Sequence, residues 1–254
     1  MKSEILYGIH PVSEALKCGK RHFLSLYITR ERASRRLAPL LETAETRKIP
    51  VEIIPEARLA ALAKTDRHQG VGARVSPFPI SDFFEVLKGA ESGSMSFLLL
   101  LDSLEDPQNL GALIRTALCA GVQAVVLPRD RSASPTPSVS KASAGALEHM
   151  PVDRVANMAR TIDLLKDQGV WVFGLDAAGD RTVYDCDFTL PLALVVGGED
   201  TGVRPLIKKH CDALAAIPQT GRIGSLNASV AGAVAMYEVF RQRKVRRDQR
   251  LEPL

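Results

Sequence analysis

The sequence predicts an α/β protein with a small N-terminal domain followed by a larger domain built on a parallel sheet. Apolar runs of strand length alternate with helical patterns along most of the 254 residues. The runs beyond residue 96 are apolar throughout, which is typical of parallel strands that helices cover on both faces. Residues 76–95 hold two prolines, two glycines and several serines, and this composition predicts a linker between the two domains.

The N-terminal domain is expected over residues 1–75. Apolar and β-branched runs predict its strands, and apolar residues at helical spacing predict its helices. The expected strands are residues 24–28, 51–54 and 71–75, and the expected helices are residues 12–17, 34–47 and 56–63. Their alternation predicts a small α/β unit.

The second domain is expected over residues 96–245, with a basic tail over residues 246–254. Its expected strands are residues 97–102, 124–127, 170–175, 192–196 and 213–217. Its expected helices are residues 110–120, 138–146, 158–168, 205–210 and 226–243. Strands separated by helices in this way predict one parallel sheet with helices on both faces.

The composition excludes several classes of protein. With 46% hydrophobic and 24% charged residues, the chain resembles ordinary globular proteins and neither disordered nor fibrous ones. The longest apolar run, Phe97–Leu101, is far shorter than the roughly 20 residues of a membrane-spanning helix, and the first residues lack a signal-peptide core. The four cysteines lie far apart, without a CxxC pair. We therefore expect a cytoplasmic protein with no disulfide framework and no metal site.

The charge is distributed unevenly, although the net charge is only +4. Residues 1–75 carry a net charge of +6, residues 76–240 carry −6, and residues 241–254 carry +4. Basic ends around a mildly acidic middle suit a protein whose ends bind a polyanion. The arginines of residues 30–36 can equally form the solvated face of a helix, so charge alone leaves both interpretations open.

The common catalytic motifs GxGxxG, GxxxxGK[ST], HExxH and GxSxG do not occur. The five histidines are scattered singly, which is typical of surface or structural residues. The informative segments are instead three places where an apolar strand runs into a polar loop. In the first, residues 98–121, Asn109 stands where a helix begins and could be its N-cap. Arg115 interrupts the apolar helix that follows and can reach back toward the helix start, where the exposed amides favour a phosphate.

The second segment, residues 192–206, passes from a strand into Gly197, Gly198 and Glu199, and glycines permit a tight turn and the close approach of a ligand. In the third, residues 215–244, Ser225 is expected to cap a long helix lined with small residues. Such residues at helical spacing indicate close packing against another backbone, within the chain or between chains. A simple turn and a simple cap are the structural explanations of these two segments.

Ligands of open α/β sheets bind at the carboxyl ends of the strands, and all three loops lie at such ends. The residues therefore predict one site that combines an amide, a guanidinium, a carboxylate, hydroxyl groups and backbone amides. No nucleophile is evident.

Together, the three segments resemble the motifs of the SpoU or TrmH family of RNA 2′-O-ribose methyltransferases. The matching stretches are N-x-G-A-x-x-R at residues 109–115, V-V-G-G-E at residues 195–199 and I-P-x-x-G…S-L-N-x-S at residues 217–229. YGIHPVSEAL at residues 7–16 and HQGVGARVSPF at residues 68–78 resemble the substrate-binding domain of those bacterial members that methylate a guanosine in 23S ribosomal RNA.

The resemblance implies an N-terminal domain with the fold of ribosomal protein L30e, which binds RNA. It implies a catalytic domain with a deep trefoil knot that holds S-adenosylmethionine, and a homodimer formed across the knot helices. It further implies a methyl-donor pocket lined by Gly197, Gly198, Ile217 and Leu226. The implied reaction centre consists of Asn109, Arg115, Glu199, Ser225 and Asn227.

The family proposal makes Arg115 the base, although a guanidinium is normally never deprotonated. Alternatively, Arg115 holds the phosphate beside the target ribose while Glu199, Ser225 or a water takes the proton. A non-enzymatic RNA-binding protein would not need the glycine-rich loops, and a small-molecule methyltransferase would not need the basic domain. Within the family, a transfer-RNA ribose methyltransferase and an adenosine-modifying ribosomal RNA methyltransferase remain alternatives.

Overall fold

The computed structural model describes residues 2–30, 37–83, 85, 86, 88, 97–199, 201–221 and 224–251. The chain forms two compact units. The first consists of Met1–Pro79 together with Ser134–His149, and the second of Ile80–Ala133 together with Met150–Leu254. The predicted domains differ from these units, because residues 134–149 pack with the N-terminal part and because residues 76–79, predicted as linker, belong to the first unit. The part of the predicted linker that follows residue 88, residues 89–95, lies outside the described residues.

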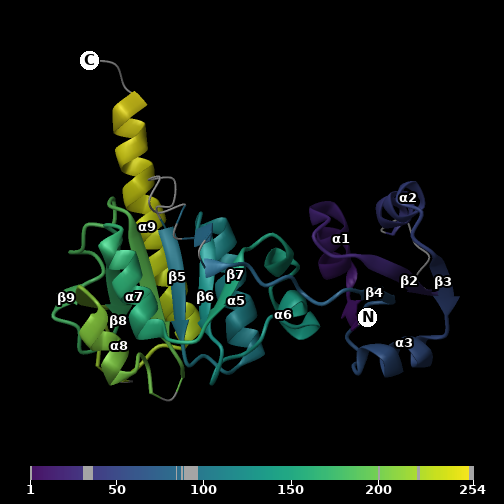
Figure 1. The fold of residues 1–254 in the computed structure, drawn as a ribbon, viewed down its shortest axis with the longest axis horizontal. Helices are drawn as coiled ribbons and strands as arrows, with labels where there is room; N and C mark the ends of the chain where they lie inside the picture. Colours follow the sequence, from purple (N-terminus) through teal and green to yellow (C-terminus); the bar gives the residue numbers. More distant parts are fainter. Residues whose placement is uncertain are drawn as a thin grey trace. The chain divides into compact units, whose positions relative to one another are not determined.

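The first unit is built on a mixed four-stranded sheet with the order β1-β4-β2-β3 (Figure 1). Strand β4 runs antiparallel to β1 and β2, whereas β2 and β3 are parallel. The strands are β1 (Glu4–Tyr7), β2 (Phe23–Thr29), β3 (Val51–Ile54) and β4 (Val71–Val75), and the helices are α1 (Ile9–Cys18), α2 (Ala38–Thr46) and α3 (Glu56–Ala63). Alternate residues of β2 face opposite sides, since Leu26 and Ile28 join one apolar cluster and Tyr27 packs with Leu59 of α3 in another.

Residues 134–149 complete the first unit through helix α6 (Pro137–Ala142) and the short helix η2 (Ala146–Glu148). Arg21, whose side chain is 0% exposed, makes a two-pronged ion pair with Glu148, with Nε–Oε2 2.7 Å and Nη2–Oε1 3.1 Å. The hydroxyl of Ser140 also donates to Glu148, and Glu4 binds the remaining side of the guanidinium. Because each buried charge has a hydrogen-bonded partner, this network fixes the segment to the unit.

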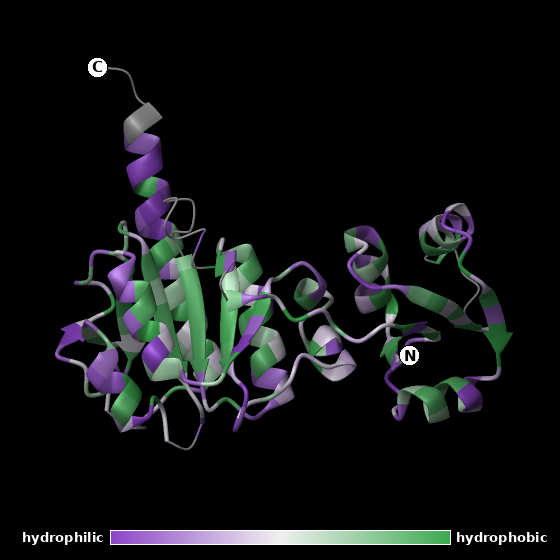
Figure 2. Ribbon diagram, in the orientation of Figure 1, coloured by the Kyte–Doolittle hydropathy of each residue, from purple (hydrophilic) through white to green (hydrophobic). Residues whose placement is uncertain are grey.

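The second unit is built on a seven-stranded sheet with the order β7-β6-β5-β10-β8-β11-β9, in which every pair is parallel. The strands are β5 (Phe97–Asp102), β6 (Ala124–Pro128), β7 (Val152–Val155), β8 (Trp171–Leu175), β9 (Arg181–Thr182), β10 (Leu192–Gly197) and β11 (Ala213–Ala216). The helices are α5 (Pro107–Cys119), α7 (Met158–Asp167), α8 (Pro205–His210) and α9 (Ala228–Leu251). Its central strands are apolar along their length, as Figure 2 shows, which agrees with the predicted parallel sheet.

Helices cover both faces of this sheet. Leu98 and Leu100 of β5 pack in one cluster with residues of α7 and α8. Helices α5 and α9 pack together on the other face, where a Cβ atom on Gly232 of α9 would run into Leu113 of α5 and lie 3.5 Å from Val196. The small residues of α9 were predicted to pack closely against another backbone, and they allow α9 to approach α5 of the same chain. The last turns of α9 extend beyond the sheet and are mainly hydrophilic (Figures 1 and 2).

The expected strands and helices are present, but three short strands were not predicted: β1, β7 and β9. Three predicted helix starts were wrong, since α1 begins three residues earlier than expected, at Ile9, α5 begins three residues earlier, at Pro107, and α9 begins two residues later, at Ala228. The expected start of the second helix, residue 34, lies outside the described residues, and α2 is described from Ala38. In the described part of the chain, no helix is both long enough and apolar enough to span a membrane.

Candidate functional site

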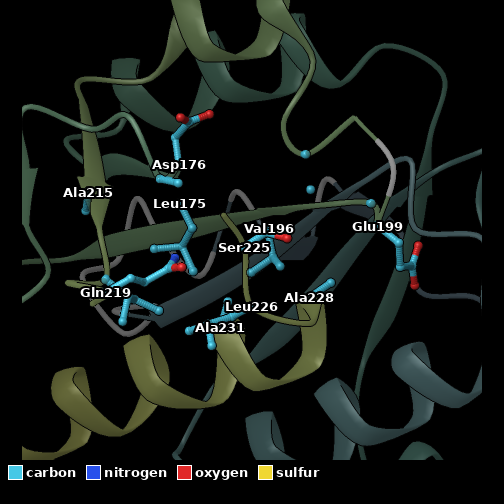
Figure 3. A pocket seen from close by; sticks show the side chains of 15 residues that line it. Leu175, Asp176, Val196, Glu199, Ala215, Gln219, Ser225, Leu226, Ala228 and Ala231 are labelled. Carbon is cyan, nitrogen blue, oxygen red and sulfur yellow. The ribbon is translucent and has the colours of Figure 1, made fainter. Parts of the chain in front are cut away.

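Two of the three predicted loops, those that follow β10 and β11, line a pocket in the second unit together with the residues after β8. The first predicted segment, residues 98–121, contributes no residue to the wall of this pocket. The pocket has a volume of about 280 Å³ and lies at the carboxyl ends of β8, β10 and β11, beside the start of α9 (Figure 3). All four residues expected to line a donor pocket line it: Gly197, Gly198, Ile217 and Leu226. Glu199 and Ser225, which were expected in the reaction centre, line it as well. The carboxyl ends of parallel strands are where such sheets bind ligands.

The loop after β10 turns tightly at one rim of this pocket. Gly202, with φ of +60°, donates its N–H to the carbonyl of Gly198 at 3.0 Å. A Cβ atom on Gly197 would run into the backbone of Gly202 and Val203, and one on Gly198 would run into the carbonyl of Ser103. Glycine is therefore required at positions 197 and 198, because other parts of the backbone occupy the space that a side chain would need.

A buried carboxylate fixes the end of this loop. Asp102, the last residue of β5, is 0% exposed. Its carboxylate accepts hydrogen bonds from the backbone N–H of Arg204 at 2.9 Å and from the Arg204 guanidinium at 2.6 and 2.8 Å. The sequence carries no signal for this pair, because its two residues lie 102 positions apart and each looks like an ordinary charge.

Three of the predicted reaction-centre residues form one hydrogen-bonded chain. The Nδ2 of Asn109 donates to Oε1 of Glu199 at 2.5 Å, and the Nδ2 of Asn227 donates to Oδ1 of Asn109 at 3.1 Å. These residues come from α5, the β10 loop and the start of α9, so each of the three motifs contributes one of them. The amide of Asn109 is thereby held in one orientation, and it presents the Glu199 carboxylate at the rim of the pocket.

Neither predicted helix cap has the expected residue. Asp106 caps α5, since its carboxylate accepts from the backbone N–H groups of Gln108 and Asn109 at 3.0 and 3.2 Å. The side chain of Asn109 is therefore available for the site. Asn227 rather than Ser225 caps α9, because its Oδ1 accepts from the backbone N–H groups of Ser229 at 2.9 Å and Val230 at 3.3 Å. Asn227 thus joins the helix start to the site, and Ser225 is exposed at the pocket.

Arg115 is not brought into this chain of hydrogen bonds. Its side chain is exposed on α5, and within the described part of the protein it makes no hydrogen bond or ion pair. It lies six residues beyond Asn109, about 9 Å along the helix and roughly 120° around it. The guanidinium is therefore free to bind an anion that approaches this face of the unit.

Asp176 also belongs to the pocket wall and is paired with Lys208 outside it, and neither residue was predicted from the sequence. Asp176 follows β8 and lines the pocket, and its carboxylate forms an ion pair with Lys208 of α8. Burial by itself raises the pKa of Asp176, but hydrogen bonds from Lys208 and from the backbone N–H of Ala178, together with the Lys208 charge, outweigh it. The pKa of this carboxyl group therefore lies below its ordinary value.

Within the described ranges, no three or more His, Cys, Asp and Glu side chains gather as metal ligands would. The polar groups at the pocket are instead carboxylates, amides and a hydroxyl. They can position a ligand, accept a proton and hold a ribose, which is the chemistry of group transfer between two bound organic molecules.

Comparison with known proteins agrees with this arrangement. The sequence model of the "SpoU rRNA Methylase family" matches residues 96–237, and that for "RNA 2'-O ribose methyltransferase substrate binding" matches residues 5–81. The 23S rRNA (guanosine-2'-O-)-methyltransferase RlmB of Photorhabdus laumondii is 41% identical over 244 residues, which are 95% of this chain and 99% of that protein. A putative TrmH family tRNA/rRNA methyltransferase of Staphylococcus aureus is also 41% identical, over 96% of this chain and 98% of that protein.

Among solved structures, the SpoU methyltransferase AviRb from Streptomyces viridochromogenes, in complex with the cofactor AdoMet, has a TM-score of 0.80 and 26% identity. The match covers 96% of this chain and 91% of that one, so it extends over both units. The family models, the near full-length relatives and the shared fold lead to one conclusion: the chain belongs to the SpoU rRNA methylase family.

Proposed function

We propose that this protein transfers a methyl group from S-adenosylmethionine to the ribose 2′-hydroxyl of a guanosine in 23S ribosomal RNA. The observation that carries the proposal is the hydrogen-bonded chain of Glu199, Asn109 and Asn227 at the rim of the pocket. Near full-length identity to an RlmB enzyme supports the guanosine of 23S ribosomal RNA as the target. With such a substrate, the protein acts in the cytoplasm.

The residues of the pocket fit a methyl donor. Its wall combines apolar side chains, among them Ile217 and Leu226, with the bare backbone of Gly197 and Gly198. Apolar surface suits an adenine ring, and exposed peptide groups suit its polar edge. When bound there, S-adenosylmethionine supplies an activated methyl group on a positively charged sulfur.

The protein must then place the 2′-oxygen behind that methyl group and remove the hydroxyl proton. Positioning reactants in this way accounts for as much as about 7–11 kcal/mol of a barrier. We assign positioning of the ribose to Asn109 and Asn227 and acceptance of the proton to Glu199, whose carboxylate is oriented by Asn109. Ser225 lies at the same pocket and can donate a hydrogen bond. The exposed Arg115 binds the phosphate next to the target ribose, which a planar guanidinium does in two-pronged fashion.

The first unit supplies RNA affinity through its basic side chains. Residues 1–75 carry a net charge of +6, and contacts to phosphates make binding weaker as the salt concentration rises. We also propose that the last segment of the chain is threaded as a deep trefoil knot, as the family resemblance implies.

We further propose that the protein is a homodimer through the second unit. Helix α9 carries exposed apolar side chains at Val230, Tyr237 and Phe240, spaced seven and three residues apart, as in a helix–helix seam. Tyr237→Asp should convert a dimer into a monomer in sedimentation experiments. Leu206→Asp, on exposed Leu206 of α8, should leave the dimer intact. A wild-type monomer at micromolar concentration would contradict the proposal.

Methyl transfer to purified RNA tests the proposed function. We expect the protein, given S-adenosylmethionine labelled in its methyl group, to label protein-free 23S ribosomal RNA from a strain that lacks the gene. It should not label the same RNA from the wild-type strain, where the site is already methylated. Labelling of transfer RNA instead would favour the alternative suggested by the tRNA/rRNA methyltransferase relative.

A further inference from the structure

Asp176 is an acidic residue at the pocket that none of the family motifs in this chain contains. It follows the last residue of β8, and Figure 3 shows it on the opposite side of the pocket from Glu199, with Ser225 between them. We assign Glu199 to the reaction centre, so a donor bound in the pocket would have the part that is remote from its methyl group beside Asp176.

The carboxylate of Asp176 is held in place but not saturated. Its side chain is only 15% exposed. One oxygen, Oδ1, accepts from the backbone N–H of Ala178 at 2.8 Å, and the other, Oδ2, forms the ion pair with Lys208. An ionised carboxylate has about four acceptor sites, so each oxygen retains capacity for a further donor. Its lowered pKa keeps the group ionised at neutral pH.

The ion pair with Lys208 decides which donor suits the remaining sites. A second ammonium group would have to share a carboxylate whose charge Lys208 already balances, and the two cations would repel each other. Uncharged hydroxyl groups meet no such repulsion. Carboxylates at strand ends of α/β sheets bind ribose hydroxyls of nucleotide cofactors in this manner.

We propose that Asp176 binds the ribose hydroxyl groups of S-adenosylmethionine and that Lys208 holds the carboxylate in the orientation for this contact. The proposal rests on the proposed function, because it takes S-adenosylmethionine as the occupant of the pocket. It assigns Asp176 to donor binding and not to the methyl transfer itself, which involves the opposite rim.

Calorimetric titration of the full-length protein with S-adenosylhomocysteine and its 2′,3′-dideoxy analogue tests this role without turnover. The wild type should bind the dideoxy analogue about tenfold or more weakly, as expected for lost hydrogen bonds to a charged group. Asp176→Ala should bind S-adenosylhomocysteine as weakly as the wild type binds the analogue, and should no longer distinguish the two ligands. Asp180→Ala, on the same loop, should behave like the wild type.

Two further measurements separate this role from others. Lys208→Met breaks the ion pair but keeps the carboxylate, so it should bind S-adenosylhomocysteine more weakly than the wild type but more tightly than Asp176→Ala, and it should still distinguish the two ligands. If Lys208→Met and Asp176→Ala lose affinity and melting temperature equally, Asp176 merely attaches α8 to the sheet and the proposal is wrong. 5′-Methylthioadenosine, which has the ribose but lacks the ammonium group, should also bind Asp176→Ala more weakly than it binds the wild type.

A loss of affinity confined to ligands with the ammonium group would overturn the assignment to the ribose. Equal binding of S-adenosylhomocysteine by the wild type and Asp176→Ala would overturn the inference alone and leave the proposed function standing. A wild-type protein that binds neither S-adenosylhomocysteine nor S-adenosylmethionine would overturn both.

Discussion

At the scale of single residues, the proposed reaction centre depends on the orientation of Glu199. Its side chain is exposed, yet Oε1 is held by Asn109, whose own carbonyl oxygen is held by Asn227. A fixed carboxylate beside the pocket is the group best suited to take a hydroxyl proton, because an ionised carboxylate has only acceptor sites whereas a guanidinium has only donors.

Changing Glu199 and Arg115 in turn distinguishes these two candidates for the base. If Glu199 is the base, the rate of methyl transfer by the wild type falls toward acid pH as the carboxylate takes up a proton. Glu199→Gln should be slow and should lack this acid limb, while S-adenosylhomocysteine still binds. Arg115→Lys should transfer methyl groups slowly, because a lysine cannot hold a phosphate in two-pronged fashion. Its rate should still fall toward acid pH, because Glu199 is unchanged. Single-turnover rates across pH give the answer, and an acid limb that persists in Glu199→Gln would exclude Glu199.

Gly197 gives a second prediction at this scale. Gly197→Ala places a Cβ atom against the backbone of Gly202 and Val203, so the loop must open and donor binding should be lost. Gly169→Ala is the matched control, because Gly169 lies outside the pocket and its Cβ atom would meet nothing within 4 Å. It pays only for the left-handed backbone, roughly 1 kcal/mol. Undiminished binding of S-adenosylhomocysteine by Gly197→Ala, measured by calorimetry, would show that this loop does not shape the pocket.

The site residues that could be predicted from the sequence are those that stand in one of the three motifs and contact a residue of another motif. Site residues whose partners lie outside the motifs could not be predicted. Asn109, Glu199 and Asn227 stand in recognisable motifs, and the structure joins them. Asp102 ends β5 and Asp176 follows β8, and neither residue stands in a motif. Asp102 pairs with Arg204 and Asp176 pairs with Lys208, and only the fold brings these partners together. A single sequence contains no signal for such pairs.

At the scale of secondary-structure elements, the start of α9 combines two roles in one side chain. Asn227 caps the helix through Oδ1 and binds Asn109 through Nδ2. A serine cap satisfies the helix N–H groups about as well as asparagine does, but it has no amide to reach Asn109.

Two substitutions of Asn227 therefore separate the roles. Asn227→Ala should cost about 1 kcal/mol of stability through the lost cap and should also impair methyl transfer. Asn227→Ser should recover most of the stability while methyl transfer stays impaired. Thermal unfolding and single-turnover rates provide the two readouts. Full activity in Asn227→Ser would mean that the bond to Asn109 has no part in the reaction.

The start of α5 and the two edge strands of the larger sheet could not be predicted, because apolar periodicity does not extend to them. Asp106 and Pro107 start α5 by the usual cap chemistry, but the apolar pattern used for prediction begins only at Leu110. The unpredicted strands β7 and β9 lie at the two edges of the sheet and have four and two residues. Strands this short contain too few residues to show an alternating apolar pattern. They are recognised as strands only because they pair with β6 and β11 in the folded sheet.

At the scale of the whole molecule, the chain passes between the two units three times, after Pro79, Ala133 and His149. The first unit is therefore not a separable N-terminal piece, although a composition shift predicts one. The Arg21–Glu148 pair lies within it, and both side chains are almost fully buried, at 0% and 2% exposed. Sequence reasoning could not foresee this, since the partners are 127 residues apart.

Removing one partner of this pair tests the composite unit. Arg21→Met leaves Glu148 as an unpaired buried charge, which typically destabilises a protein by about 3–5 kcal/mol. Lys17→Met, which removes the exposed pair with Glu14, should cost less than about 1 kcal/mol. Denaturant unfolding of the full-length variants compares the two. Equal stabilities would show that residues 134–149 do not anchor the first unit.

The same network predicts that a chain lacking residues 1–75 also loses the packing of α6 and η2.

The central claim is that this chain methylates a guanosine ribose in 23S ribosomal RNA. Mass spectrometry of nucleosides from purified 23S ribosomal RNA and transfer RNA, taken from strains with and without the gene, tests it most directly. We expect one 2′-O-methylguanosine to disappear from 23S ribosomal RNA when the gene is deleted. The wild-type gene should restore it, whereas Asn109→Asp, which sets a second carboxylate against Glu199, should not. Unchanged 23S ribosomal RNA together with a lost ribose methylation in transfer RNA would contradict the account.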